Sequence, residues 1–215
     1  MRTRKRTVSM VCLAGAIALA ATGMARAKQA GKADGTPPAE RGALLVQVGG
    51  CNHCHTPWHF DANLGMPVPD MKRMLSGHPA DAPDPEGKPG KRDIGLIGPT
   101  FTSFTMPFGT VYAPNLTPDK ETGLGSWTEK MFVDAIKNGK HMGGNGRAIL
   151  PPMPWMDFAT LPEADLKSLY AFLKTIPSVR NPVPAHKVPE PVYAAITENF
   201  EKLKKAMQGA RAARP

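Results

Sequence analysis

Helical spacing of apolar residues appears in several stretches of the chain. The first stretch starts at Thr36-Pro37, which offers an N-cap residue followed by a proline suited to the first helical turn. Gly49-Gly50 should stop it. The second follows Ser126-Trp127-Thr128-Glu129, a capping-box sequence, and stops at Asn138-Gly139. Its apolar positions, which share one helix face, are Met131, Phe132, Ala135 and Ile136.

Two more helices are predicted towards the C-terminus. One enters near Pro162, carries apolar residues at i, i+3, i+4 and i+7, and ends at Ile176-Pro177. The other follows Pro191 and combines one apolar side with several lysines, which makes it basic and amphipathic. The apolar positions of these two helices are Leu166, Leu169, Tyr170 and Leu173, and then Ile196, Phe200, Leu203 and Met207.

Residues 60–110 have neither a helical nor a strand period and contain eight prolines. With 23 Pro and 21 Gly in 215 residues, a regular helical bundle and a large continuous sheet are both disfavoured. No strand pattern is longer than a few residues. We therefore expect short helices separated by long turns, with a long Pro/Gly-rich loop over 60–110 and something besides side chains in the core.

Residues 1–27 have the three parts of a secretory signal. A basic start precedes an uncharged, largely apolar stretch from Val8 to Met24, and Ala25-Arg26-Ala27 supplies small residues at the cleavage site. We expect cleavage before Lys28 and an exported, periplasmic protein. The alternative is an uncleaved membrane anchor, for which this stretch is at the short end. Cys12 lies inside the signal and has no role in the mature chain.

The formal charge of +9 belongs mainly to the two ends of the chain. The signal contributes five basic residues and no acid, and the chain from Glu198 onward contributes five basic and two acidic residues. Residues 28–197 are left with a charge of only +1. This distribution argues against nucleic acid as a partner of the mature protein.

Cys51-Asn52-His53-Cys54-His55 is a C-x-x-C-H sequence, the attachment pattern of c-type haem. Two thiols bond to the two vinyl groups of one haem, and the next residue directs an imidazole to the iron. A single such sequence predicts one covalent haem. The alternatives are a redox-active dithiol, half of a zinc site, or a small structural disulfide.

A c-type haem usually takes Met or a second His as its sixth ligand. We predict Met153, because it lies in Leu150-Pro151-Pro152-Met153-Pro154-Trp155, where three prolines restrict the backbone. The alternative for Met153 is simple packing in the core. The main rival ligand is His141, which follows a helix stop and precedes two glycines. Weaker candidates are Met106, Met142 and Met156.

The chain resembles class I-type cytochromes c, and more closely the single-haem domains of the cytochrome c subunits of membrane-bound alcohol and gluconate dehydrogenases. The resemblance spans residues 40–182. It rests on the haem motif, on 112–119 (Tyr-Ala-Pro-Asn-Leu-Thr-Pro-Asp), on 122–127, on Pro152-Met153-Pro154-Trp155, and on 165–177. The subunits often carry three haems, whereas this chain has one attachment motif.

The resemblance implies an all-α cytochrome c-like fold around one haem. It implies thioether bonds at Cys51 and Cys54 and axial ligands at His55 and Met153. It also implies haem contacts from a turn that contains Asn115 and Thr117. To these candidate contacts we add Pro152 and Trp155.

The predicted organisation is a signal over 1–27, a cytochrome c domain over 28–190, and a basic amphipathic extension over 191–215. We expect an electron-transfer protein rather than an enzyme, exchanging single electrons with a dehydrogenase, an oxidase or another cytochrome. The mature protein should be soluble or peripherally associated with a membrane. The alternatives are a small haem enzyme or gas sensor with an open sixth position, and a non-haem dithiol or metal-binding module.

Overall fold

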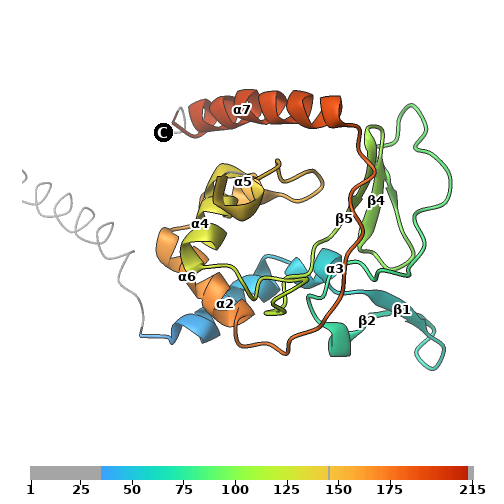
Figure 1. Ribbon diagram of the computed structural model, residues 1–215, viewed down its shortest axis with the longest axis horizontal. Coiled ribbons are helices and arrows are strands. Elements are labelled where there is room, and N and C mark those ends of the chain that lie inside the picture. Colours follow the sequence, from blue (N-terminus) through green and yellow to red (C-terminus); the bar gives the residue numbers. More distant parts are fainter. Residues whose placement is uncertain (1–34, 145, 213–215) are drawn as a thin grey trace, which may run out of the picture. The chain divides into compact units, whose positions relative to one another are not determined.

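Six α-helices and five short strands occur in residues 35–144 and 146–212, which the computed structural model describes (Figure 1). The predicted signal over 1–27 lies outside these residues. Residues from Pro37 onward form one unit by their contacts. The helices are α2 (Pro38–Val48), α3 (Cys51–His55), α4 (Glu129–Asn138), α5 (Trp155–Phe158), α6 (Glu163–Leu173) and α7 (Glu190–Ala212). The strands are β1 (Trp58–Asp61), β2 (Met66–Pro69), β3 (Leu96–Ile97), β4 (Ser103–Met106) and β5 (Gly109–Tyr112), and the 3-10 turns are η1 (Met71–Arg73) and η2 (His141–Gly144).

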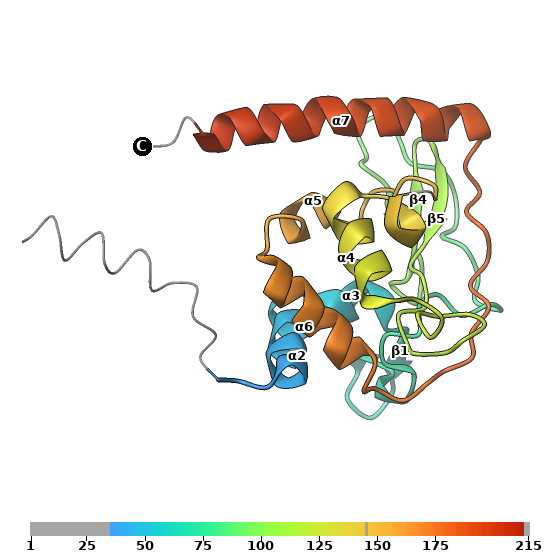
Figure 2. The same ribbon diagram turned by 60° about the vertical axis from the view of Figure 1, so that its left-hand side comes forward.

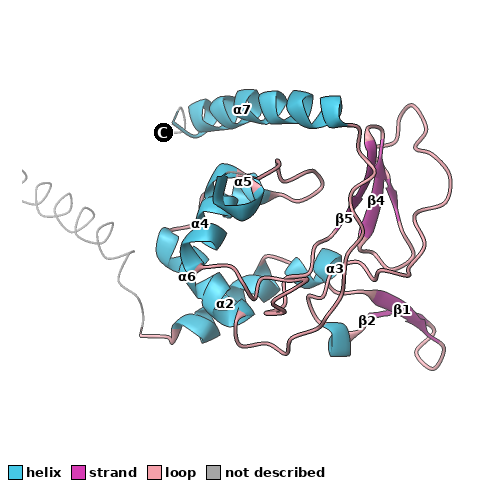
Figure 3. Cartoon of the chain, in the orientation of Figure 1, coloured by secondary structure: helices cyan, strands magenta, loops and turns pink. Residues whose placement is uncertain are grey.

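The all-α prediction is wrong, because the segment predicted as a long loop contains two antiparallel sheets (Figure 3). Strands β1 and β2 pair as a hairpin, and β3, β4 and β5 form a three-stranded sheet in that order. Each strand has only two to four residues, and β5 buries three consecutive side chains. Strands this short, without alternating burial, leave no period of two in the sequence.

Helix α2 crosses α6 at very close range, as the views from two sides agree (Figure 2). A Cβ atom at Gly42 would lie 1.9 Å from the carbonyl oxygen of Ser168, so the residue must be glycine. Beside this crossing, Arg41 donates from Nε and Nη2 to the two carboxylate oxygens of Asp165, at 2.9 and 3.0 Å. Helix α2 starts one residue later than predicted, with Pro37 and not Thr36 as the N-cap.

Helices α2, α4 and α6 bury one apolar core between them, which includes predicted positions of α4 and α6 such as Phe132 and Leu169. Its buried members are Val46, Leu75, Leu124, Phe132, Val133, Leu166, Leu169, Leu173 and Ile176. Helix α6 ends at Leu173 rather than at Ile176-Pro177. Ile176 is nevertheless part of the core, because the chain beyond the helix keeps its side chain buried.

Helix α4 takes its N-cap from Thr128, whose Oγ1 accepts a hydrogen bond from the Met131 amide at 3.2 Å. The predicted capping box beginning at Ser126 is therefore wrong by two residues, because another hydroxyl residue lies nearer the helix. The helix ends as predicted at Gly139, which adopts φ +67°.

Replacing Thr128 with alanine should lower the free energy of unfolding by about 1 kcal/mol, because the Met131 amide would lose its acceptor. Ser126→Ala is the matched control and should change it by less than about 0.5 kcal/mol. Urea unfolding of both variants measures the difference. An equal loss of unfolding free energy in the two variants would contradict the assignment of Thr128, rather than Ser126, as the N-cap.

Helix α7 packs its N-terminal half against the rest of the unit. Phe200 meets the ring of Trp155 edge to face, with centroids 5.8 Å apart. Ile196 is half-buried, whereas Leu203 is exposed. The apolar side of α7 is therefore packed against the unit as far as Phe200 and exposed at Leu203. The Met207 side chain lies outside the described residues. No helix within the described part of the chain has the length and apolar character that crossing a membrane requires.

Candidate haem-binding site

Helix α3 consists of the C-x-x-C-H residues themselves, which places both cysteines on one face, one helical turn apart. Gly50 precedes the helix with φ +67°, a conformation that allows the sharp change of direction after α2. Both thiols are free and half-buried. Cys51 packs against the apolar core.

Burial raises the pKa of the Cys51 thiol to about 11, and it also raises the pKa of the Cys54 thiol. Catalytic dithiols and metal-binding cysteines depend on the thiolate, so they have lowered pKa values. These two thiols are thus held uncharged in apolar surroundings. Among the described residues, no group of three or more His, Cys, Asp and Glu side chains is arranged to hold a metal ion.

His55 is buried and has one defined hydrogen bond. Its Nδ1 donates to the carbonyl of Pro114 at 2.9 Å, so the other ring nitrogen, Nε2, has its lone pair free for a metal. Burial lowers the pKa of the imidazole, which favours the neutral form that a metal requires. By contrast, His53 is exposed and its ring stacks with Trp58.

Gly77 joins His55 to the segment that carries its acceptor. Its amide donates to the His55 carbonyl at 2.8 Å. On its other side, a Cβ atom would lie 2.6 Å from the Ala113 carbonyl oxygen and 2.6 Å from the Pro114 carbonyl carbon. Gly77 also has φ +78°, a conformation that favours glycine. Only glycine lets the backbone at 113–115 approach His55 this closely.

Asn115 and Thr117 hold that segment through side-chain hydrogen bonds. Asn115 Oδ1 accepts from the amide and the hydroxyl of Thr117, at 2.9 and 2.8 Å, and its Nδ2 donates to the carbonyl of Val179 at 2.8 Å. Thr117 Oγ1 accepts from the Val179 amide at 3.1 Å. Both side chains are buried. Their polar atoms form hydrogen bonds with other residues of this chain. The predicted haem contacts of both residues stay predictions.

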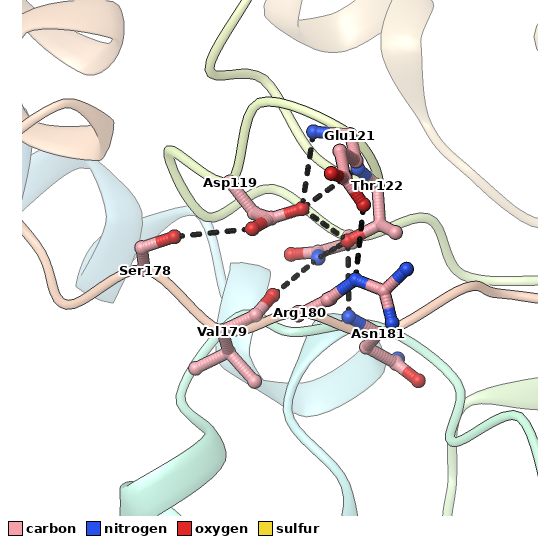
Figure 4. A network of polar contacts seen from close by, with 8 residues as sticks. Asp119, Glu121, Thr122, Ser178, Val179, Arg180 and Asn181 are labelled. Atoms are coloured by element: carbon pink, nitrogen blue, oxygen red, sulfur yellow. Dashed lines mark hydrogen bonds and ion pairs between the residues drawn. The ribbon is translucent and has the colours of Figure 1, made fainter.

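Segment 178–181 is the strap that closes over this turn (Figure 4). Asn181 donates from its amide to Thr122 Oγ1 at 3.0 Å, and its Nδ2 donates to the carbonyls of Ser76 and His78 at 2.7 and 2.9 Å. Asp119 supports the same turn by accepting from the Thr122 hydroxyl at 2.6 Å. The strap thus fixes the backbone on either side of Gly77 and ties it to the turn at Thr122.

Met153 lies on a separate segment, between Ala148 and helix α5. It is half-buried, and its amide donates to the Leu150 carbonyl at 3.3 Å. Pro152 beside it is exposed, and the Pro151-Pro152 bond is cis. Trp155 is 2% exposed, and its indole N–H has no acceptor among the described residues. Ligation by Met153 stays a prediction.

The rival ligand His141 is half-buried at the start of η2, where it meets the ring of Trp127 edge to face at 4.9 Å. Burial and the charge of Arg147 lower the pKa of this imidazole.

The donor set fits a covalent haem. Two uncharged thiols one turn apart, an adjoining imidazole with Nε2 free, and an apolar core beside them are what the attachment requires. Sequence reasoning missed Gly77, Asn181 and the Pro114 carbonyl. No pattern in the sequence marks Gly77 or Asn181, and a backbone acceptor leaves no mark in the side-chain sequence.

Comparison with known proteins finds relatives among dehydrogenase and cytochrome proteins. The chain is 31% identical over 149 residues, 69% of its length, to a nicotinate dehydrogenase subunit of Pseudomonas putida. It is 39% identical over 66 residues, 31% of its length, to the gluconate 2-dehydrogenase cytochrome c subunit of Pantoea cypripedii. It is 26% identical over 170 residues, 79% of its length, to a diheme cytochrome c-type protein of Cereibacter sphaeroides.

The matched regions cover 9%, 14% and 47% of these three relatives, so the chain spans less than half of each. No protein-family model matches the chain. The predicted resemblance to dehydrogenase cytochrome subunits is confirmed by these relatives. The chain contains a cytochrome c domain similar to those of the cytochrome c subunits of dehydrogenase complexes.

Proposed function

We propose that this protein is an exported, periplasmic electron carrier with one covalent haem c. In this proposal Cys51 and Cys54 hold the haem, and His55 and Met153 are the axial ligands. Electrons pass one at a time between redox proteins, for example from a dehydrogenase into a respiratory chain. The protein catalyses no reaction of its own. The signal over 1–27 directs export, 28–190 form the cytochrome domain, and 191–215 are an extension to it.

The observation that carries this proposal is the geometry of α3. Five residues supply both thiols and an imidazole whose Nδ1 is already bonded to Pro114, so the free Nε2 has a fixed direction. The relatives named as cytochrome c subunits of dehydrogenases support the redox role and the class of partner.

A bound haem supplies reversible one-electron chemistry at its iron. The chain contributes attachment through two side chains of one rigid helix, so the group keeps its orientation. The hydrogen bond from His55 to Pro114 keeps the imidazole from rotating and increases its basicity. The apolar core of α2, α4 and α6 lowers the local dielectric constant, which tunes the reduction potential.

The decisive experiment is to produce the protein together with the haem-attachment machinery and record its pyridine and reduced-minus-oxidised spectra. We expect one c-type haem per chain, and loss of the covalent haem in Cys51→Ala/Cys54→Ala. His53→Ala is the matched control, because it lies in the same motif but is exposed. A colourless purified protein with free thiols would support the dithiol alternative. Two haems per chain would contradict the prediction of a single covalent haem.

Met153→His should lower the reduction potential, because replacing a thioether with a second imidazole favours the ferric state. The ferric variant should also lose the sulfur-to-iron charge-transfer absorption. Met156→Leu, three residues away, should keep both properties. Strong carbon monoxide binding by the ferrous wild type at neutral pH would instead indicate an open sixth position, as in a sensor or a small haem enzyme.

A further inference from the structure

The hairpin of β1 and β2 follows the C-x-x-C-H motif almost directly and exposes one apolar face. Strand β1 begins three residues after His55, and the hairpin projects from the body beyond α3 (Figure 1). Residues opposite each other in an antiparallel pair share a face, and the faces alternate along each strand. The register therefore places Trp58 and Phe60 on the same face as Pro67 and Pro69. Phe60 is 66% exposed, so this face is open to solvent.

Ring contacts connect this face with the motif. The Trp58 ring stacks with that of His53 at 6.2 Å between centroids, and its centroid lies 5.5 Å from that of Phe101. The Trp58 amide donates to the Thr100 carbonyl at 3.0 Å, which fastens the turn that carries Phe101 to β1. The apolar surface therefore begins beside the motif. We term it the hairpin patch, which consists of Trp58, Phe60, Pro67, Pro69 and Phe101.

Phe101 holds its exposed ring at the expense of backbone strain. Its φ is +58°, a left-handed conformation that is unfavourable for a bulky side chain. Leu75 has nearly the same φ, +60°, but its side chain is completely buried in the core, so burial offsets the strain. Phe101 remains 42% exposed, so burial within this chain offsets less of its strain. Such outliers occur at functional sites, and this one indicates that the ring becomes buried in a complex.

The hairpin patch consists of aromatic and proline side chains alone. The hairpin has one acidic residue, Asp61, which lies on the other face and accepts from the amides of Asn63 and Leu64. The next charged residue along the chain, Asp70, is paired with Arg73 at 2.8 Å. A charge placed against the patch would lose hydration without gaining a counter-charge. Electrostatic complementarity therefore favours a partner surface that is uncharged and apolar.

We propose that the hairpin patch is the docking surface for a redox partner protein whose contact face is apolar and uncharged. This inference rests on the proposed function, because docking there brings the partner beside the helix that would hold the haem. The association depends on buried apolar area and therefore responds little to salt. The strands that build the patch are a departure from the all-α fold that the resemblance implied. The docking surface is accordingly a property of this chain.

The test uses the haem-loaded protein, with a methyl-terminated monolayer on gold as the probe for an apolar, uncharged partner surface. Cyclic voltammetry measures how much electroactive protein the monolayer holds. Phe60→Ser should weaken this adsorption at least about tenfold, as expected for an aromatic residue inside an interface. Leu203→Ser is the matched control, because Leu203 is also exposed but belongs to α7, away from the hairpin in both views (Figure 1, Figure 2). It should adsorb like the wild type.

Phe101→Gly separates docking from a structural role of the ring. Glycine adopts a positive φ without strain, so relief of strain should offset the lost contact with Trp58. The midpoint of urea unfolding should therefore change little, whereas adsorption to the methyl-terminated monolayer should weaken as in Phe60→Ser. A large fall in the midpoint together with unchanged adsorption would show that the ring serves only to pack on Trp58, and would contradict the inference.

Three other results would overturn the inference. A wild type that adsorbs only to a carboxylate-terminated monolayer, and is released by salt, docks through charge. A wild-type dimer in sedimentation that Phe60→Ser abolishes would assign the patch to a second copy of the chain. Binding to phosphatidylglycerol vesicles that the same variant abolishes would assign it to lipid. A wild-type protein without haem would contradict the proposed function itself, and its absorption spectrum shows this before any adsorption is measured.

Discussion

Gly42→Ala should destabilise the domain by about 3 kcal/mol, the largest loss that we expect from adding one methyl group. The new Cβ would lie 1.9 Å from the Ser168 carbonyl oxygen and 2.7 Å from the Phe172 Cβ. The oxygen belongs to the α6 backbone, so relief requires the two helices to separate. That separation would also strain the bidentate ion pair between Arg41 and Asp165.

Intrinsic helix propensity acts in the opposite direction. Alanine is favoured over glycine by about 1 kcal/mol in a helix interior, so a loosely packed α2 would be stabilised by the change. Urea unfolding of the haem-loaded protein decides which effect dominates. Gln47→Ala, at an exposed position of the same helix, should change the free energy of unfolding by less than about 0.5 kcal/mol. A Gly42→Ala variant as stable as the wild type would mean that the helices do not cross at this distance.

Gly77→Ala should displace the acceptor of His55 and cost about 2 to 3 kcal/mol of stability. The added Cβ would meet the backbone of 113–115 at 2.6 to 2.7 Å, and the positive φ adds strain. Because Pro114 belongs to that backbone, its carbonyl should move away from His55 Nδ1. An imidazole without this bond is less firmly oriented, so the haem-loaded variant should contain a mixture of iron spin states.

Gly65→Ala is the matched control for this effect. Gly65 also has a positive φ, +65°, but a Cβ there would have no neighbour within 4 Å. The variant should therefore lose only what the backbone strain costs, about 1 to 2 kcal/mol, and keep the wild-type spectrum. Absorption and electron paramagnetic resonance spectra of the two variants measure the difference. Identical spectra would show that the close approach at Gly77 does not support His55.

The helical part of the fold could be predicted because apolar residues recur at helical spacing over several turns. The core faces of α4 and α6 follow from residues such as Phe132 and Leu169, and Gly139 ends α4 where the sequence indicates. The sheets could not be predicted, because β3 has two residues and β5 buries consecutive side chains. Their pairing depends on partners that only the folded chain brings together.

The candidate site could be predicted only as far as its side chains identify it. The spacing of Cys51, Cys54 and His55 is a local signal, and the structure places them on one short helix. The support of His55 is not local. It depends on a backbone carbonyl at Pro114 and on Asn181, which nothing in the sequence distinguishes from ordinary loop residues.

The strap constrains the order in which the contacts around the candidate site can form during synthesis and folding of the chain. Asn181 Nδ2 bonds the Ser76 carbonyl, 105 positions earlier in the chain, so this bond forms long after the cysteine helix has been made. A nascent chain that has reached only α4 has both thiols but nothing to clamp 76–78 against the turn at Thr122. Without the Asn181 contacts, the backbone on either side of Gly77 is not held against that turn. The strap can therefore close over this turn only after helix α6, which precedes it in the chain, has been made.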